Sequence, residues 1–461
     1  MQLTYVEETA LTEDVDIQIL AGKLFDPIDL NYISHRLIVV CRQRGIITDV
    51  REFSKDEEDV LLRQKNTIDL RGQTVFPGFV DAHVHFFLHP YSETSWDDQA
   101  TRESVVERTV RAVTHAKRTL LAGFTAVRDL GTEGAGDADI SLRKCLSGPD
   151  SLIPGPRYFC ANRAIVTTGS YGPKGVHNMN KEGVDGITGA EAADGPSQCR
   201  QAVRRQVGAG ADWIKSRMGR AAPKISSKAI TTFLPDELRD IGDTVDQLGV
   251  KIAVHLNENI TAKKLLKSIT PNSIEHGTNL EYSELRELAQ RGIFWVPTLA
   301  AYHSSAIRTG DASRWESAQV AFKQGLRLSN LKIACGGDTG VFPHGDNALE
   351  MKMMFRLGAN PKNILRSATL YGWECIRGMQ WEGNDGEERI KQLPNLREDI
   401  SVNGDNDMPF GVIRPGWAAD IIATKEDPEK DFEKAITATN ISFVMKNGIV
   451  YKLGGAEVVV H

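Results

Sequence analysis

Short apolar runs recur through the middle of the chain and alternate with stretches of helical periodicity. The runs are TVFPGFVDAHVHF, GFTAVRDL, PRYFCANRAIV, DWIKSR, KIAVHL, NSIEHG, IFWVPTL and KIACGGDTG. The helical stretches include LPDELRDIGDTVDQLG, YSELRELAQRG and TRESVVERTVRAVTHAKRTLLAG, which we expect to begin at a cap on Thr101. Eight strand-like runs interleaved with helices predict an α/β fold, a (β/α)8 TIM barrel. A doubly wound open sheet is the alternative.

Both ends of the chain carry short β-rich pieces instead. VDIQILAGKLFDP and HRLIVVCRQRGIITDV lie near the start, and GVIRPGWAADIIAT and ISFVMKNGIVY lie near the end. The Asn447-Gly448 pair within the last piece predicts a hairpin turn. We therefore expect a small β-sandwich domain built from residues 1–76 and 405–461, and a barrel over residues 77–404.

Two long inserts rich in Gly, Asn and charged residues interrupt this pattern, at 164–200 and 380–410. Both are expected to be irregular. Loops of such length in a compact domain are usually functional or disordered. The first insert follows the third strand-like run, on the side where barrel loops build active sites, so we expect it to form a lid or a substrate wall.

Composition narrows the class of protein. Hydrophobic residues make up 41% and charged residues 25% of the 461 residues, which is a globular balance. The net charge of -6 offers no basic surface for nucleic acid. The six cysteines form no CxxC pair and are expected to be reduced thiols. No secretory signal or long apolar span is visible, so we expect a cytoplasmic enzyme that acts on a small molecule without a membrane partner.

Polar residues fall at the ends of the strand-like runs. His83 and His85 are two apart, so both imidazoles project to one face of a strand. Lys215, His255, His276 and Asp338 end or interrupt four other runs. In a TIM barrel these ends converge on one mouth.

Each of these groups alone could be a hydrogen-bonded core residue. Burying four imidazoles, an amine and a carboxylate together without a ligand would be costly. Imidazole and carboxylate are typical ligands of zinc and similar divalent ions. An ammonium beside cations would be repelled, but a carbamate formed on Lys215 would supply anionic oxygens.

In this order, PGFVDAHVHF, the lysine of DWIKSR, VHL, IEH and GGDTG resemble the binuclear amidohydrolase superfamily. The likeness is to the branch with imidazolonepropionase-like enzymes, prolidase-like Xaa-Pro dipeptidases and an ochratoxin-hydrolysing amidase. The resemblance implies two divalent ions, expected to be Zn²⁺, and a homo-oligomer is also expected. By the resemblance His83, His85 and Asp338 would bind one ion and His255 and His276 the other. Carboxylated Lys215 and a hydroxide would bridge them, with Asp338 as the catalytic base.

Two departures from this branch fall in the expected pocket. Tyr171 stands in TTGSYG where relatives place a histidine, and SRMGR brings Arg217 and Arg220 near the mouth. Tyr171, Arg217, His303 and His344 are therefore the expected substrate contacts.

The expected activity is hydrolysis of an amide, a peptide-like bond or a cyclic amide. A lactonase, decarboxylase or lyase of secondary metabolism on the same scaffold is the alternative. A catalytically silent binding protein is a further one, disfavoured because all six ligand positions are present.

Overall fold

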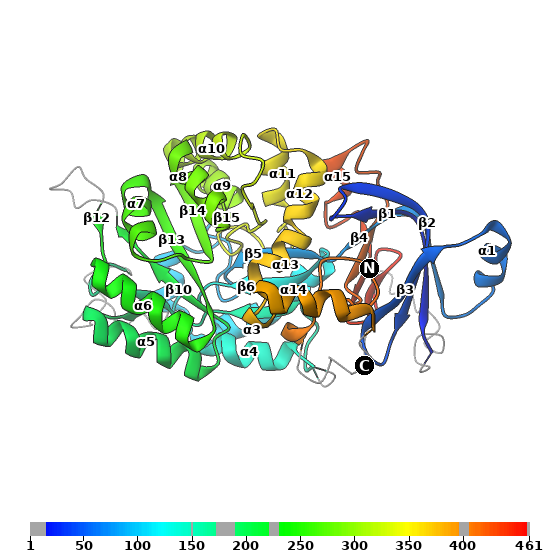
Figure 1. Cartoon of the computed structure of the whole chain (residues 1–461), viewed down its shortest axis with the longest axis horizontal. Helices are drawn as coiled ribbons and strands as arrows, with labels where there is room; N and C mark the ends of the chain where they lie inside the picture. Colours follow the sequence, from blue (N-terminus) through cyan, green and yellow to red (C-terminus); the bar gives the residue numbers. More distant parts are fainter. Residues whose placement is uncertain (1–14, 149–150, 172–189, 221–229, 396–404, 459–461) are drawn as a thin grey trace.

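The computed structural model of the chain describes residues 15–148, 151–171, 190–220, 230–395 and 405–458 (Figure 1). A ring of strands surrounded by helices forms one part, and a sheet built from both ends of the chain packs against it. Among these described residues, no helix combines the length and apolar character needed to cross a membrane.

The ring consists of parallel strands that follow the apolar runs of the sequence, with two short strands, β7 and β8, in the third run. The strands are β5 (Phe79–Val84), β6 (Phe124–Asp129), β7 (Arg157–Cys160), β8 (Ala164–Val166), β10 (Trp213–Arg217), β13 (Lys251–Glu258), β14 (Ser273–Asn279) and β15 (Phe294–Val296). They form the sheets β5-β6-β7 and β15-β14-β13-β10-β8-β9, in which β9 (Ala190–Ala192) is an edge strand. Parallel strands of a barrel are buried on both faces, and every residue of β5, β6, β7, β8 and β15 is buried.

The last apolar run closes the ring without forming a regular strand. Parallel bridges join Trp295 to Ile333 and Val84 to Thr339. Backbone hydrogen bonds from Ala82 to the Cys335 carbonyl and from Asp338 to the His83 carbonyl, each of 2.8 Å, continue the join. The first and eighth runs therefore lie side by side, which confirms a closed (β/α)8 barrel rather than an open sheet.

Helices follow the strands around the outside of the ring. They are α3 (Val105–Leu121), α4 (Ala138–Leu146), α5 (Gly195–Ala209), α6 (Pro235–Leu248), α7 (Asn259–Ser268), α8 (Tyr282–Arg291), α9 (Leu299–Thr309), α10 (Ser313–Gly325), α11 (Leu349–Arg356), α12 (Pro361–Ser367) and α13 (Leu370–Ile376). The predicted helices α6 and α8 end at Gly249 and Gly292, whose φ values of 64° and 68° need the freedom of glycine. The predicted cap on Thr101 is wrong. Thr101 lies inside the separate helix α2 (Trp96–Arg102), and Ser104 caps α3 by accepting from the Glu107 amide.

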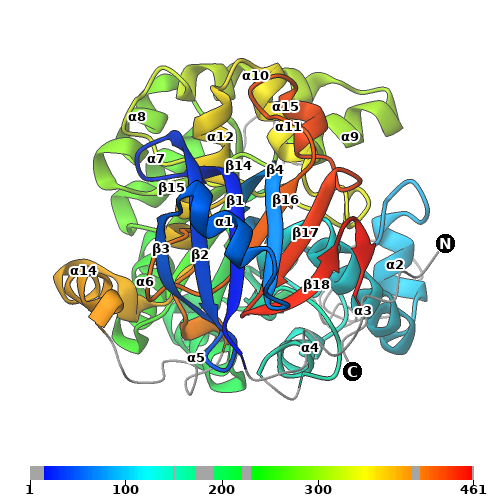
Figure 2. The same ribbon diagram turned by 90° about the vertical axis from the view of Figure 1, so that its right-hand side faces the viewer.

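The sheet domain combines both chain ends in one eight-stranded sheet, β19-β18-β17-β16-β4-β1-β2-β3. Figure 2 shows the N-terminal strands in blue beside the C-terminal strands in red. Their bounds are β1 (Ile17–Asp26), β2 (Asn31–Cys41), β3 (Ile46–Glu52), β4 (Thr67–Pro77), β16 (Ile421–Thr424), β17 (Ile441–Lys446), β18 (Ile449–Leu453) and β19 (Ala456–Glu457). A bridge between Ile46 and Ala418 joins the β3 edge of the sheet to the segment just before β16. The sheet therefore closes into a sandwich around one apolar core.

The Asn447-Gly448 turn between β17 and β18 confirms the predicted hairpin. Both residues have positive φ, 50° and 73°, as a type I′ turn requires. The fold class predicted from the sequence, a TIM barrel with a small sandwich domain from both ends, is confirmed.

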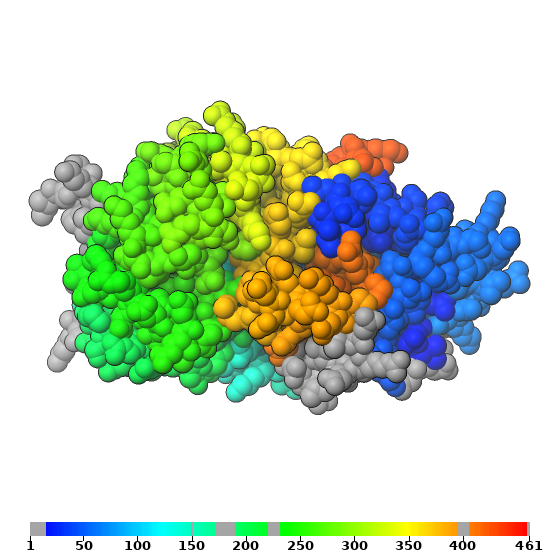
Figure 3. All heavy atoms as spheres, viewed as in Figure 1, coloured from blue at the N-terminus to red at the C-terminus, as the bar shows by residue number. Residues whose placement is uncertain are grey.

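The insert at 380–410 is more regular than expected. Its first part forms α14 (Gly383–Gln392), which Figure 3 shows in orange on the surface between the barrel helices and the sheet domain. Trp381 is buried beside Trp373, which anchors this helix to the barrel. Of the insert at 164–200, the structure describes β8, β9 and the start of α5, while 172–189 lies outside the described residues.

Candidate active site

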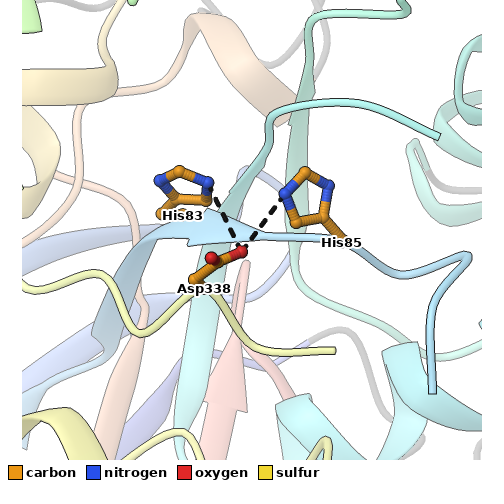
Figure 4. A group of neighbouring side chains, drawn as sticks. All are labelled: His83, His85 and Asp338. Atoms are coloured by element: carbon orange, nitrogen blue, oxygen red, sulfur yellow. Dashed lines mark ion pairs between the residues drawn. The ribbon is translucent and has the colours of Figure 1, made fainter. Parts of the chain in front are cut away.

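Three predicted ligands meet where β5 and the eighth run end (Figure 4). His83 and His85 both turn a ring nitrogen to the Asp338 carboxylate. The Nε2 atoms lie 3.6 and 3.3 Å from Asp338 Oδ1. One ligand atom from each residue lies within 4.8 Å of the others, as a shared metal requires.

Asp81, two residues before His83, holds together the two strands beneath this group. Its buried carboxylate accepts from the amides of His83 and Gly337, both at 3.1 Å, and from the Thr339 hydroxyl at 2.9 Å. A Cβ on Gly336 would lie 2.9 Å from the His83 nitrogen. Glycine is therefore required for the close approach that brings Asp338 to the histidines.

The second histidine pair lies directly beside the first. The ring centroids of His255 and His276 are 4.2 Å apart, and those of His83 and His276 are 5.0 Å apart. His276 Nδ1 hydrogen-bonds the Thr298 hydroxyl at 2.8 Å. His276, Thr298 and Asp338 all have left-handed φ, 69°, 51° and 58°, and such backbone strain clusters at functional sites.

Lys215 projects into the same cavity from β10. Its amine is buried and has no hydrogen-bond partner among the described residues. Burial lowers the pKa of Lys215 to about 8, so its neutral, nucleophilic form is accessible near neutral pH. An unpartnered buried amine is costly, and a modification or ligand would remove that cost.

A buried acidic residue orients His83. Glu275 Oε2 contacts His83 Nδ1 at 2.8 Å, and its Oε1 accepts from the Arg128 guanidinium at 2.8 Å. Burial opposes the charge of Glu275, but Arg128 and His83 outweigh it and lower the pKa of the carboxyl. Because Nδ1 is engaged, Nε2 of His83 is the nitrogen that faces Asp338.

The electrostatics of the imidazoles suit metal ligation. Burial lowers the pKa of His83 to about 4 and that of His255 and His276 far below the usual value, which keeps these rings neutral. His85 differs: burial opposes its charge, but the Asp338 carboxylate raises the pKa of His85 to about 9. Imidazoles and a carboxylate are a donor set that fits divalent metal ions, and His85 would release its proton when an ion binds.

The six predicted ligands line one cavity of about 650 Å³ at the C-terminal ends of the strands. Tyr171 and Arg217 line it as well, and the Arg217 guanidinium lies over the Tyr171 ring at 5.2 Å from its centroid. The side chain of Arg220 is not among those described.

The structure does not bring His303 and His344 to this cavity. His303 packs edge-on against Trp315, with ring centroids 5.2 Å apart. His344 is buried, stacks on His115 at 4.2 Å and contacts the carbonyls of His85 and Leu88. It therefore supports the turn after β5 rather than facing a substrate.

Several residues on the cavity wall were not predicted from the sequence. They are Tyr91, Trp96, Glu133, Tyr302, Arg308 and Arg314. Glu133 could have been found, because it is the one charged residue among the glycines of LGTEGAG after a strand end. Tyr302 directly precedes the predicted His303 on α9. The orientation of this helix about its axis decides that Tyr302, and not His303, lines the cavity.

Comparison with known proteins covers almost the whole chain. Residues 74–378 match the amidohydrolase family. Ochratoxinase from Aspergillus niger is 23% identical over 474 residues, which span 96% of this chain and 88% of that protein.

Solved structures give the same pattern. A Xaa-Pro dipeptidase with methionine bound in its active site superposes with a TM-score of 0.76 at 25% identity, covering 95% of this chain and all of the other. The crystal structure of A. niger ochratoxinase superposes with a TM-score of 0.74 at 21% identity and covers 96% of each chain.

Proposed function

This chain belongs to the amidohydrolase family, and from that premise we propose that it is a metal-dependent hydrolase of a C–N bond, an amide or peptide-like bond, in a small molecule. Family membership and the ochratoxinase relative make it a hydrolase that acts on amide bonds. The observation that carries the metal dependence is the convergence of His83, His85 and Asp338 within 4.8 Å.

We assign the metal-holding role to all six converging groups. His83, His85 and Asp338 would hold one ion, and His255 and His276 a second. A carbamate on Lys215 would be a ligand of both ions. The unpartnered amine of Lys215 supports this assignment. Zn²⁺ is the proposed ion. When bound, the ions would lower the pKa of water and polarise the scissile carbonyl.

The protein's own proton carrier in this proposal is Asp338. Its carboxylate lies at the floor of the cavity against His83 and His85. Burial would raise the pKa of Asp338, but its interactions with His83 and His85 overcome this and lower it. An ionised carboxylate there can accept a proton from the attacking water and deliver it to the leaving amine.

Three arginines line the cavity, Arg217, Arg308 and Arg314, and they come from three different elements. Guanidinium groups bind carboxylates in a bidentate manner, so we propose a substrate whose scissile bond lies next to a carboxylate. The ochratoxinase and Xaa-Pro dipeptidase names of two relatives agree with an amide-type substrate. Tyr171 would form the facing wall.

The test combines metal analysis with a substrate panel. Protein purified without chelator should contain more than one equivalent of divalent metal, and chelation followed by Zn²⁺ should remove and restore activity. The panel consists of N-acyl amino acids, Xaa-Pro dipeptides, lactams and lactones. Lactone turnover without amide turnover would favour the lactonase alternative. Less than half an equivalent of metal, with no gain on reconstitution, would refute the binuclear site.

A cytoplasmic location, a homo-oligomeric assembly and the domain limits of 1–76 with 405–461 and 77–404 are also proposals. The limits agree with the break between β4 and β5, where Pro77 ends a sheet-domain strand and Phe79 begins the barrel. Sedimentation at several protein concentrations would measure the assembly.

A further inference from the structure

One carboxylate on the cavity wall has no part in the chemistry above. Glu133 lies in the loop after β6, lines the cavity and is only 9% exposed. Its φ of 51° is in the left-handed region, which residues other than glycine adopt at an energetic cost. Such a residue persists where its surroundings hold it, and these positions cluster at ligand sites.

Two donors from other elements hold the Glu133 carboxylate in place. The Trp96 indole donates to Oε2 at 3.0 Å, and the Tyr171 hydroxyl donates to the same oxygen. The rings of Trp96 and Tyr171 pack edge to face, 5.6 Å apart. The carboxylate is therefore held through Oε2, and neither donor bonds the second oxygen, Oε1.

Both of these donors are neutral, so neither forms an ion pair with the carboxylate. Arg108 is a buried cation whose charge interacts with Glu133 across the loop, while its Nε and Nη2 donate to the carbonyls of Phe87 and Thr132. The aromatic rings of Tyr91, Trp96 and Tyr171 line the cavity beside Glu133. A carboxylate among aromatic rings is an environment that attracts organic cations.

Glu133 is also close to the ligand cluster. A Cβ placed on Gly131 would lie 3.8 Å from Glu133 Oε1 and 3.9 Å from His85 Cε1. The carboxylate and the metal-site histidine therefore flank the same glycine. A group bound at Oε1 would be near a scissile bond held at the metal site.

We propose that Glu133 is a specificity-determining residue that binds a cationic group of the substrate, such as the free ammonium of a dipeptide. The inference rests on the proposed amidase function and adds a charge requirement to it. Glu133 would hold the ammonium while the arginines hold the carboxylate, so the preferred substrate is zwitterionic.

The kinetic test compares matched substrates in wild type and Glu133→Gln. Each pair is a dipeptide and its N-acetyl form, in which acetylation removes the charge of the amino end. Wild type should favour the free dipeptide in kcat/KM by about 10- to 100-fold, the usual worth of a charge-assisted hydrogen bond. In Glu133→Gln, which keeps an acceptor oxygen for Trp96 and Tyr171, the ratio should fall towards one.

Glu258→Gln is the matched control, because Glu258 lines the same cavity from β13. Its ratio should stay near that of wild type. An equal fall in both variants would show that the preference depends on the net charge of the cavity rather than on Glu133, and it would overturn the proposal. A wild-type ratio of one or below would overturn it as well.

A binding measurement separates this inference from the amidase proposal. Tetramethylammonium has no lone pair for a metal, and neopentyl alcohol is a neutral probe of similar size. Calorimetry on metal-loaded protein should show about 10-fold weaker binding of the cation to Glu133→Gln and unchanged binding of the alcohol. Equal cation binding would refute the role of Glu133. Cation discrimination in a protein that hydrolyses neither member of any pair would refute the amidase function alone.

Discussion

Glu275 lies between the Arg128 guanidinium and the His83 imidazole, and all three side chains are buried. Arg128 also donates to the Ala82 carbonyl at 2.7 Å and lies over the Trp213 ring. A buried charge is tolerated only when it is paired and hydrogen-bonded. Residues behind the ligands therefore set the geometry of the ligands.

Glu275→Gln should weaken metal binding about 10- to 100-fold, the usual effect of removing a carboxylate that orients a ligand histidine. It should also destabilise the fold by about 3–5 kcal/mol, because Arg128 is left as an unpaired buried charge. Metal-buffered titration and urea unfolding measure the two effects. Wild-type affinity in the variant would show that His83 is oriented by other contacts.

Asp338→Asn should keep the fold and bind metal but lose about 10²- to 10⁴-fold in kcat, since the amide cannot accept a proton. Metal content and kcat are measured on the same preparation. A variant with full metal and near wild-type kcat would place the base elsewhere, with Tyr171 as the next candidate on the cavity wall.

Helix α9 shows how an element carries side chains to the cavity. The Glu350 carboxylate of α11 accepts from the Ala300 amide at 2.7 Å and so holds the first turn of α9. From there the helix presents Tyr302 and Arg308 to the cavity. The second carboxylate oxygen of Glu350 is buried without a partner among the described residues, and burial raises the pKa of Glu350 to about 8.

This pKa predicts a pH dependence of stability. Between about pH 4.5 and 8 the folded protein keeps a proton on Glu350 that the unfolded chain releases. The free energy of unfolding should therefore fall as pH rises through this window, by up to about 1.4 kcal/mol per pH unit from this group. Glu350→Gln should lose that slope. Urea unfolding from pH 5 to 8.5 tests this, and an unchanged slope in the variant would assign it to another group.

At the scale of the whole molecule, one buried ion pair joins the barrel to the sheet domain. Arg157 of β7 donates to both oxygens of Asp420, at 2.8 and 3.0 Å, and Asp420 directly precedes β16. The guanidinium also contacts the Asp405 carbonyl and Asn447. Three segments from the C-terminal part of the chain thus converge on one barrel strand.

Asp420→Asn should lower the free energy of unfolding by about 3–5 kcal/mol, because the Arg157 charge stays buried without its partner. Glu433→Gln breaks the exposed pair with Arg356 and should cost at most about 1 kcal/mol. Urea unfolding of both variants gives the comparison. Equal losses would show that the buried pair contributes no more than a surface one.

The sequence by itself determined the barrel, the sheet domain from both ends and the positions of the six converging polar groups. These follow from local rules: apolar runs fully buried in parallel strands, helical periodicity between them, and polar residues where strands end. Helix starts were less certain from sequence, since Ser104 and Thr101 are both common N-cap residues. Ser104 is used because α2 ends before it.

Only the tertiary structure decided which of the other residues face the cavity. Tyr302 and His303 are adjacent in sequence. The orientation of α9 about its axis places Tyr302 on the cavity wall and His303 against Trp315. His344 resembles a loop ligand by sequence but stacks on His115 in the core. Glu133 gains its position from Trp96 and Tyr171, each more than thirty residues away in the chain. Such contacts depend on how separate elements pack, which no local pattern encodes.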